Sequence, residues 1–594
     1  MDTFAEFTLT RAGGLDIFRD IRAAQWRNDA THMFCFQCQE TGEGKACTHG
    51  GECGKSEEAA NLQDLLIYTL KGIGILNNAL FNSGAAIDRE VGMFVCHALF
   101  STVTNTNFDP DRLQVLIARA LAIKRDLRAR HADALQGNGD RDSIGGESST
   151  IIKAWPEDEH VVWDSTDRAA IVKKAYEVGV LSTANEDIRS LREMITYALK
   201  GMAAYTYHAN ILGYFDDTIL VFIYRALAAV AREHTLDALV TLALEAGKVN
   251  IDAMALLDKA NNGTYGQSTV SKVPLGVRTN PGILISGHDL KDIEDLLTQT
   301  DETGIDVYTH SEMIAAHYYP KLKKFSHLAG NYGNAWWNQE EDFATFNGPI
   351  IVTSNCITPV NPSYAGRIFT TGPAAYPGVR HIQRDKNERI DFGEVIALAK
   401  RLPPPKPIDA QIFTGGFGWR QLAEAAPRII DLVRAGRIGR FIVIAGCDGR
   451  DRSRIYYHQV AERLPVDSII LTAGCAKYRF MKLNLGEIDG IPRIVDAGQC
   501  NDCYSLVKIA LLLMEGFAAK SINELPISFD IAWYDQKAVA VLLSLLHLGV
   551  SGLRLGPTLP GFLSPRVRAM LAERFAIRPI GTSEADARAM MAGK

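Results

Sequence analysis

Ten cysteines carry the most evident chemistry of this 594-residue chain, and nine of them fall into two groups. The first group places four thiols in a short glycine-rich stretch, at Cys35, Cys38, Cys47 and Cys53. Four thiolates so close together suit a tetrahedral zinc ion or an iron–sulfur cluster. Glycines let the backbone wrap closely around such a group. The spacing slightly favours a cluster over zinc, and unrelated reduced cysteines remain the simplest alternative.

The second group of potential ligands follows predicted strands in the C-terminal half. Short β-rich runs alternate there with helical stretches, which is typical of parallel sheets with crossover helices. Ligands of open α/β sheets bind outside the carboxyl ends of the strands, so we expect the residues that follow these runs to meet in one crevice. These residues are His288, Glu312, Cys356, Cys447, Cys475, Cys500 and Asp535.

The chemistry of this second set is mixed. Thiolates favour sulfide-bridged iron and carboxylates favour iron with oxygen ligands, so the set predicts a cluster with both kinds of bridge and an open iron for substrate. Any single His or Glu after a strand is more often a helix cap or a surface residue, and the joint occurrence carries the prediction. Cys503 resembles half of a redox pair, but we interpret it as a residue at a helix start. Cys96 lies in an apolar run and is expected in a helix core.

The elements that must position these residues change character along the chain. From Glu57 to about Asn262, apolar residues recur at helical spacing, interrupted by a Gly-, Asp- and Ser-rich surface loop at about 135–159. No strand signal precedes residue 280, and a Pro-rich stretch at 401–407 predicts a linker. The expected fold class is multidomain α plus α/β, a helical-bundle domain followed by two Rossmann-like α/β domains with parallel sheets. The predicted domains are 33–262, which includes the first cysteine group, 263–405 and 406–594.

Composition excludes several classes of protein. The formal charge of −6 and the pI near 6.2 argue against a general nucleic-acid binder. The longest apolar stretch, Ala538 to Val550, is too short to cross a bilayer and predicts a buried helix, so no membrane partner is expected. The cysteines are too few for a disulfide scaffold, so reduced thiols and a cytoplasmic location are expected. Residues 1–32 carry no signal pattern, and we interpret Met33 as the functional start and residues 1–32 as an unstructured leader.

Nine short motifs together resemble the hybrid cluster protein (prismane) family, in family order from Met33 to near the C-terminus. They are MFCFQCQET, SGHDL, YTHSEM, GNYGNAWW, TSNC, GCDG, GCAKYRF, GQCND and WYDQKA. The resemblance implies a 4Fe-4S cluster on the four N-terminal cysteines, because their short spacing resembles that branch and not the 2Fe-2S branch. It also implies a hybrid 4Fe-2O-2S cluster with a persulfide at Cys447 and with Lys537 beside it. The implied ligands of that cluster are His288, Glu312, Cys356, Cys447, Cys475 and Cys500.

One position departs from the family motif. The residue before QKA is a glutamate ligand in the family, and here it is Asp535. Aspartate keeps the carboxylate but loses roughly 1.5 Å of reach. Either the backbone moves inward, a water bridges the gap, or the iron loses a ligand.

The family resemblance implies an oxidoreductase that converts hydroxylamine, two electrons and two protons into ammonia and water. His288, Glu312, Asp535 and Lys537 are then candidates to tune the iron or deliver protons. An external donor, a flavin reductase or a ferredoxin, would supply electrons through the N-terminal cluster, since no nicotinamide-binding fingerprint follows a predicted strand. Three alternatives stay open: reduction of nitric oxide at the same site, a carbon monoxide dehydrogenase-like enzyme, and a nitric-oxide-responsive protein that nitrosylates partners through Cys447 or Cys503.

Overall fold

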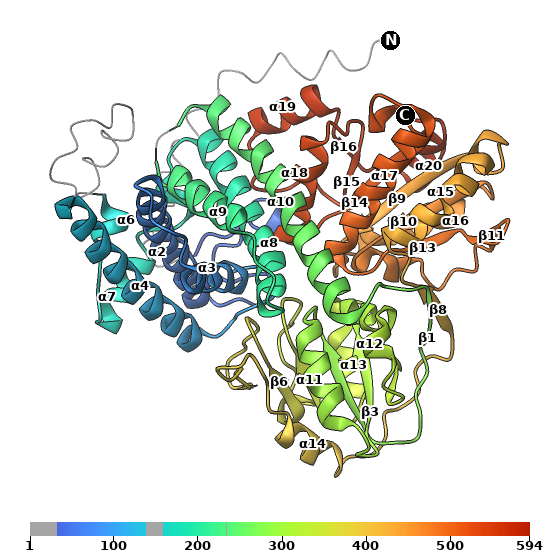
Figure 1. The fold of residues 1–594 in the computed structure, drawn as a ribbon, viewed down its shortest axis with the longest axis horizontal. Coiled ribbons are helices and arrows are strands. Elements are labelled where there is room, and N and C mark those ends of the chain that lie inside the picture. The colour runs from blue at the N-terminus through green and yellow to red at the C-terminus, as the bar shows by residue number, and fades with distance from the viewer. Residues whose placement is uncertain (1–32, 138–157, 233) are drawn as a thin grey trace.

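The computed structural model describes residues 33–137, 158–232 and 234–594. The predicted leader, residues 1–32, and most of the predicted surface loop at 135–159 lie outside the described residues. Figure 1 shows a group of helices in blue to green, a green-to-yellow sheet region below them and an orange-to-red sheet region beside them. The expected fold class, helices followed by two regions with parallel sheets, is confirmed.

The helical region holds long helices with well-formed N-terminal caps. In four of them the side chain of the N-cap residue accepts a hydrogen bond from a backbone N–H of the first turn, as short polar residues at this position usually do. These N-cap residues are Ser56, Asp88, Asn185 and Thr235. Cys96 is fully buried, as expected. The helices of this region are α2 (Glu57–Asn82), α3 (Arg89–Ser101), α4 (Pro110–Gly137), α6 (Glu159–Val162), α7 (Arg168–Ala175), α8 (Glu186–Ile211), α9 (Asp217–Val230) and α10 (Leu236–Tyr265).

The first sheet has six parallel strands in the order β4-β3-β2-β5-β6-β7. Every residue of its central strands is buried, as expected for a parallel sheet covered on both faces. Its strands are β2 (Gly282–Ser286), β3 (Asp306–His310), β4 (Leu328–Asn331), β5 (Ile350–Val352), β6 (Ile368–Thr370) and β7 (Arg380–His381). The helices around it are α11 (Leu290–Thr300), α12 (Pro320–Lys323), α13 (Gln339–Thr345) and α14 (Gly393–Ala399).

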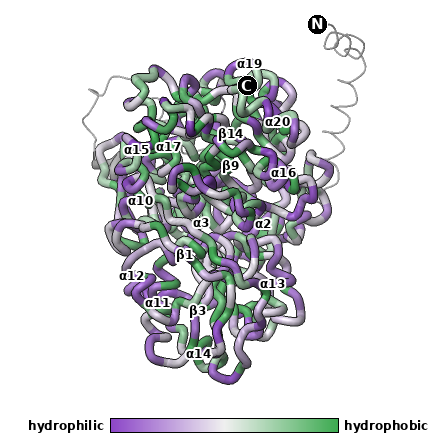
Figure 2. Tube along the Cα trace, turned by 90° about the vertical axis from the view of Figure 1, so that its right-hand side faces the viewer, coloured by the Kyte–Doolittle hydropathy of each residue, from purple (hydrophilic) through white to green (hydrophobic). Residues whose placement is uncertain are grey.

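The second sheet also has six parallel strands, in the order β13-β10-β9-β14-β15-β16. In Figure 2 the hydrophobic part of the tube runs through β9 and β14 in the interior. The strands are β9 (Arg440–Gly446), β10 (Ser468–Thr472), β13 (Ile494–Asp496), β14 (Ile527–Ala532), β15 (Arg554–Gly556) and β16 (Arg578–Pro579). The helices are α15 (Trp419–Arg434), α16 (Ile455–Arg463), α17 (Cys503–Phe517), α18 (Gln536–His547), α19 (Pro565–Phe575) and α20 (Ser583–Met591).

Two short pairings complete the sheets, and one of them corrects the sequence analysis. Strand β1 (Ser271–Pro274) pairs antiparallel with β8 (Ile412–Gly415), so the expectation of no strand before residue 280 was wrong. Only Val273 is buried in β1, and a partner so distant in sequence leaves no local pattern to detect. The other pair is β11 (Glu487–Ile488) with β12 (Ile491–Pro492).

Helix α18 lies at the centre of the molecule. It packs against α8 and α10, and one hydrophobic core joins these helices to the second sheet. Ten of its residues are buried, which confirms the buried helix predicted from the apolar stretch. Among the described residues, no helix is long and apolar enough to cross a membrane.

Candidate metal centres

The seven predicted ligands of the second group all lie just beyond strand ends, as expected. His288 follows β2, Cys356 follows β5, and Cys447 directly follows β9. The others lie in short 3-10 helices or at a helix cap: Glu312 in η3 (Ser311–Tyr318) after β3, Cys475 in η7 (Cys475–Arg479) after β10, Cys500 in η8 (Cys500–Asp502) after β13, and Asp535 between β14 and α18. The carboxyl ends of both sheets therefore supply this set.

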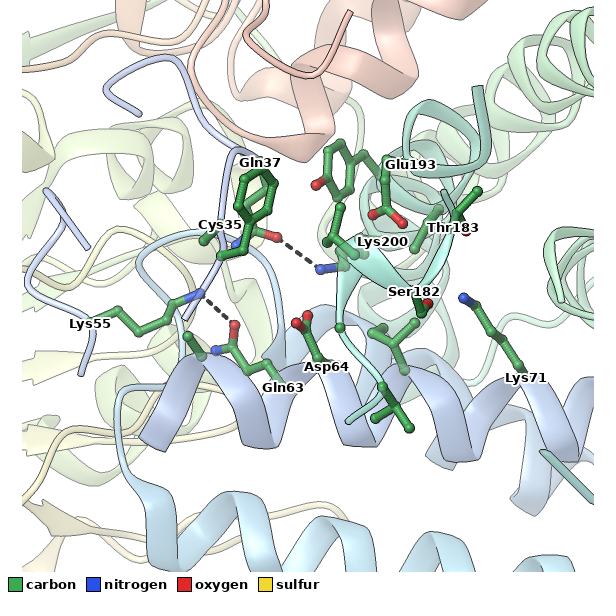
Figure 3. Close-up of a pocket in the computed structure, with 18 residues that line it drawn as sticks. Cys35, Gln37, Lys55, Gln63, Asp64, Lys71, Ser182, Thr183, Glu193 and Lys200 are labelled. Carbon is green, nitrogen blue, oxygen red and sulfur yellow. Dashed lines mark hydrogen bonds between the residues drawn. The ribbon is translucent and has the colours of Figure 1, made fainter. Parts of the chain in front are cut away.

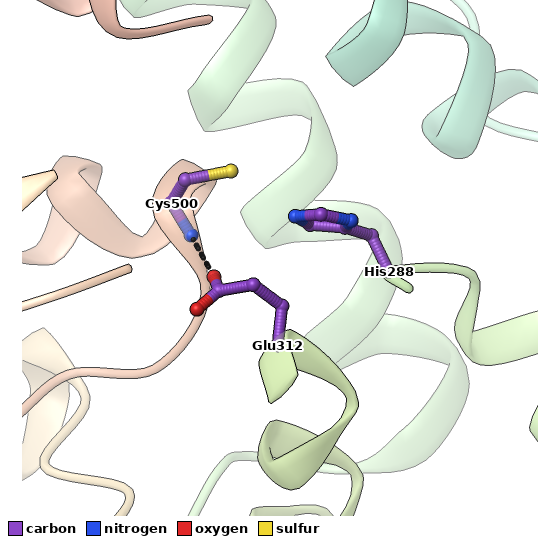
Figure 4. Close-up of side chains that lie close together, drawn as sticks. All are labelled: His288, Glu312 and Cys500. Carbon is purple, nitrogen blue, oxygen red and sulfur yellow. Dashed lines mark hydrogen bonds between the residues drawn. The ribbon is translucent and has the colours of Figure 1, made fainter. Parts of the chain in front are cut away.

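Three members of the set, one of each ligand type, meet across the two sheets (Figure 4). Potential ligand atoms of His288, Glu312 and Cys500 lie within 4.8 Å of one another. The backbone N–H of Cys500 donates to Glu312 Oε2 at 2.9 Å. The other carboxylate oxygen, Oε1, is buried and accepts no hydrogen bond from the described residues. A buried acceptor without a donor is costly, and a metal ion would satisfy it.

His288 is oriented by one ring nitrogen and by its backbone N–H. Nδ1 and the backbone N–H both contact Ser354 Oγ at 2.9 Å, which leaves Nε2 to face the site. Second contacts of this kind commonly orient histidine ligands. Burial, and then the charge of Lys537, hold the pKa of His288 well below its usual value, so the imidazole is neutral, which is the form that binds metals.

Lys537 supplies one positive charge of the site in this structure. Its Nζ lies 3.0 Å from His288 Nε2 and donates to Asn355 Oδ1 at 2.8 Å. Burial alone would lower the pKa of Lys537, but the negative charges of Cys500 and Asp535 more than offset it, and the pKa is raised. The ammonium therefore occupies the centre of a donor set that is suited to a cation.

Asp535 and Cys356 share the side-chain amide of Asn355. Asn355 Nδ2 donates to Asp535 Oδ2 at 2.9 Å and to Cys356 Sγ at 3.5 Å. Cys447 Sγ lies 3.8 Å from Asp535 Oδ1, and the same oxygen caps α18 by accepting from the backbone N–H of Lys537. Cys356 has a φ of 88°, a left-handed conformation that is rare for a residue with a side chain and typical of functional sites.

The buried thiols of this group have unfavourable charged forms. Burial raises the pKa of Cys356, Cys447 and Cys475 well above the usual value, and it raises that of Cys500 to about 11. Cys475 Sγ lies 3.3 Å from Ser311 Oγ. The charge of Lys537 does not offset the burial of Cys356 and Cys500, whereas a coordinated metal ion deprotonates such thiols outright. The donor set therefore fits a metal cluster.

The first cysteine group folds into a tight loop before α2. Cys35 and Cys47 exchange two backbone hydrogen bonds of 3.0 and 2.8 Å, and the N–H of Gly42 points at Cys47 Sγ at 3.4 Å. Burial raises the pKa of Cys38, and the charges of Cys53 and Cys35 raise it further. These thiols therefore lie close enough to interact. A Cβ on Gly51 would lie 3.0 Å from Cys53 Sγ, which explains the glycine.

The four sulfurs of this loop are not gathered around one point. In the described part of the chain, no three of these thiols lie within 4.8 Å of one another. A tetrahedral zinc ion with Zn–S bonds of about 2.3 Å needs sulfurs roughly 4 Å apart, so the loop as folded is not already a zinc site.

Comparison with known proteins identifies the family. The family model described as the Prismane/CO dehydrogenase family matches residues 33–588. The chain belongs to this family. A hydroxylamine reductase from Desulfosudis oleivorans is 52% identical over 567 residues, covering 95% of this chain and 100% of the relative. A hydroxylamine reductase from Clostridium botulinum (strain 657) is 51% identical over 571 residues, covering 94% and 100%.

Two solved structures with the same fold are carbon monoxide dehydrogenases. One from Thermococcus sp. AM4, free of nickel, has a TM-score of 0.52 and 15% identity and covers 95% of this chain and 90% of its own. Carbon monoxide dehydrogenase IV from Carboxydothermus hydrogenoformans has a TM-score of 0.54 and 14% identity and covers 98% and 97%. At this identity the likeness shows the fold alone.

A polar cavity beside Cys35 was not anticipated from the sequence (Figure 3). It has a volume of about 40 Å³, and its wall includes Cys35, Asp64, Glu193 and Lys200. Lys200 Nζ donates to Gln37 Oε1 at 2.8 Å. Burial, and then the charge of Glu193, raise the pKa of Asp64 to about 7, and burial lowers that of Lys200 to about 8. These residues lie on separate segments, so no local motif marks them.

Several supporting residues were also missed, although motifs contained them. Ser354 and Asn355 stand in the TSNC motif just before Cys356. Gln499 Nε2 donates to the backbone oxygens of both His288 and Glu312 at 3.1 Å, which ties the two sheets together at the site. Cys503 begins α17 and is buried in the hydrophobic core, which confirms its interpretation as a residue at a helix start.

Proposed function

We propose that this chain reduces hydroxylamine to ammonia and water with two electrons and two protons. The observation that carries the proposal is the meeting of His288, Glu312 and Cys500 across two sheets, with a buried carboxylate oxygen that has no donor among the described residues. The curated relatives that are about half identical over their whole length are hydroxylamine reductases. Reduction of nitric oxide at the same site is a close variant that the same donors would support.

The proposed cofactors are two iron–sulfur clusters. A 4Fe-4S cluster on Cys35, Cys38, Cys47 and Cys53 is supported by their short spacing in the sequence and by their position in one loop before α2. A hybrid 4Fe-2O-2S cluster, with a persulfide at Cys447, is supported by the mixed thiol, imidazole and carboxylate set. When bound, it supplies an iron with an open position that polarises the N–O bond as a Lewis acid. The proposed ligands are His288, Glu312, Cys356, Cys447, Cys475, Cys500 and Asp535.

The chain's own residues would orient the substrate and move protons. Lys537 is a buried ammonium within hydrogen-bond reach of His288 and Asn355, so it is placed to donate to the oxygen that leaves as water. Glu312 and Asp535 are the carboxylates that would accept or return a proton beside it. Asn355 contacts both Lys537 and Asp535 through its side-chain amide and so fixes their relative positions.

Electrons would come from an external donor, a flavin reductase or a ferredoxin, and would enter through the N-terminal cluster. Cys35 is partly exposed at the polar cavity, which supports entry on that side. We retain a cytoplasmic location because the ten cysteines are free thiols. The proposed domain division is 33–262, 263–405 and 406–594. Strands β1 and β8, which pair with each other, lie just after the first and the second boundary.

The test is anaerobic, hydroxylamine-dependent oxidation of a reduced dye by protein with both clusters loaded. Two dye electrons should be consumed for each ammonia formed. Cys447→Ser should abolish turnover, whereas Cys96→Ala, which removes a buried thiol from α3 away from the site, should retain it. Loaded wild-type protein without turnover would refute the proposal.

A further inference from the structure

The two cysteine groups approach each other at one backbone contact. Gln39 directly follows Cys38, and Tyr534 directly precedes Asp535. The N–H of Gln39 donates to the backbone oxygen of Tyr534 at 3.0 Å. From the Cys38 sulfur to the Asp535 carboxylate, the connection therefore consists of covalent bonds and a single hydrogen bond.

A buried cation holds this contact in place. Arg454 is fully buried, and its Nη2 donates to Gln39 Oε1 at 2.8 Å and to the backbone oxygen of Trp533 at 2.7 Å. Its Nη1 donates to the backbone oxygen of Cys447 at 3.3 Å. One guanidinium thus binds three segments, each of which carries a proposed cluster ligand or the residue next to one. Its fixed fork suits such multiple contacts.

The surroundings of the contact are dry and rigid. Tyr534 is 3% exposed, and its ring lies 4.6 Å from that of Trp336. Its hydroxyl donates to Asn105 Oδ1 at 3.0 Å, and the backbone oxygen of Asn105 accepts from the N–H of Cys356 at 2.8 Å. Close packing of this kind fixes distances, which is what electron transfer between two fixed groups requires.

We propose that electrons pass from the N-terminal cysteine group to the second site through the Gln39–Tyr534 contact, with Arg454 as its positioning residue. The inference rests on the proposed ligand roles of Cys38 and Asp535. In each step the first cluster loses one electron and the second gains one. The external donor then replaces the electron, and no atom or proton crosses the contact.

The test measures internal electron transfer directly, in holoprotein without hydroxylamine. A flash-activated reductant loads less than one electron per molecule, and the reoxidation of the N-terminal cluster is followed optically and by electron paramagnetic resonance. Gln39→Pro removes the donor N–H of the contact. Arg454→Met removes the guanidinium that binds the Gln39, Trp533 and Cys447 segments. Both should slow the transfer several-fold at equal driving force, for which the two reduction potentials are measured in every variant. Arg454→Lys, which keeps the charge, should restore part of the rate.

The matched control is Arg493→Met. Arg493 is also a buried arginine of the second sheet, and it donates to backbone oxygens of Leu464 and Ser468 away from either cysteine group. Its loss should lower stability but leave the transfer rate intact. If Gln39→Pro does not load iron, Arg454→Met becomes the deciding variant for the electron route. A wild-type transfer rate in loaded Arg454→Met overturns the inference. Normal internal transfer without hydroxylamine turnover would instead refute the proposed function and leave the route standing.

Discussion

Gly201→Ala tests whether the close approach of α8 to α18 positions the second site. A Cβ at Gly201 would lie 2.7 Å from the backbone oxygen of Gln536 and 2.8 Å from Lys537 Cα. To reach an ordinary contact of 3.4 Å, the first turn of α18 must move by about 0.7 Å. Functional groups must be held within about 0.5 Å of their productive geometry. The shift therefore suffices to disturb the contacts that Lys537 and Asp535 make.

The cost in stability should be modest. Overpacking of this kind costs about 1–3 kcal/mol, and alanine returns about 1 kcal/mol of helix propensity. Because a protein of several domains with bound clusters does not unfold in one step, the measurement is the apparent melting temperature. We expect a small decrease, together with a loss of most hydroxylamine turnover and an altered resonance signal of the second cluster.

Gly247→Ala is the matched control, because Gly247 lies on α10 and also packs closely against α18. A Cβ at Gly247 would lie 2.1 Å from the backbone oxygen of Leu543, a more severe clash two turns further from Asp535. It should lower the melting temperature more than Gly201→Ala while retaining more turnover. If activity instead follows the melting temperature in both variants, the reasoning about placement is refuted.

Three further predictions concern single side chains. Asn355→Ala removes one buried hydrogen bond from Asp535 Oδ2 and one from Lys537 Nζ, at a cost of about 1–3 kcal/mol. It should lower turnover and iron content together, whereas unchanged iron and rate would contradict its role. Cys38→Ser should remove the resonance signal of the first cluster and stop dye-driven turnover while the second signal persists. Because the pKa of Asp64 is raised in the folded protein, protonation of Asp64 contributes to stability in full below about pH 3.9, the pKa of the unfolded chain, and this contribution is lost as the pH rises through about 7. Asp64→Asn should therefore flatten the fall of the melting temperature over that interval, and an unchanged profile would exclude Asp64 as its source.

Strand ends were the part of the site that sequence could predict. Parallel strands bury both faces, so they read as short apolar runs, and the chain must turn directly after them. The position of Cys447 after β9 and of His288 after β2 follows from that rule. The resemblance to the prismane family was confirmed by the family match over residues 33–588.

The contacts between distant segments could not be predicted in the same way. Strand β1 finds its partner far along the chain in β8, and Arg454 meets Gln39 across more than four hundred residues. In the sequence, Gly201 is only a residue of low helix propensity inside a helix. The packing of α18 against it shows why a side chain is excluded there. Periodicity reports which face of an element is buried, but it does not report which element lies against that face.

Asp535 both caps α18 and faces the site of the second cysteine group. A glutamate, which the family motif has at this position, would favour the second role over the first. As the N-cap of α18, Asp535 accepts from the Lys537 N–H at 2.9 Å, and the same oxygen lies 3.8 Å from Cys447 Sγ. A glutamate would reach about 1.5 Å further but is a poor cap, which costs about 1 kcal/mol. Asp535→Glu should therefore lower the melting temperature of the iron-free protein and, in the loaded protein, sustain or raise turnover. An unchanged melting temperature would show that the cap contributes nothing, and a loss of turnover would show that the site depends on the shorter side chain held at the start of α18.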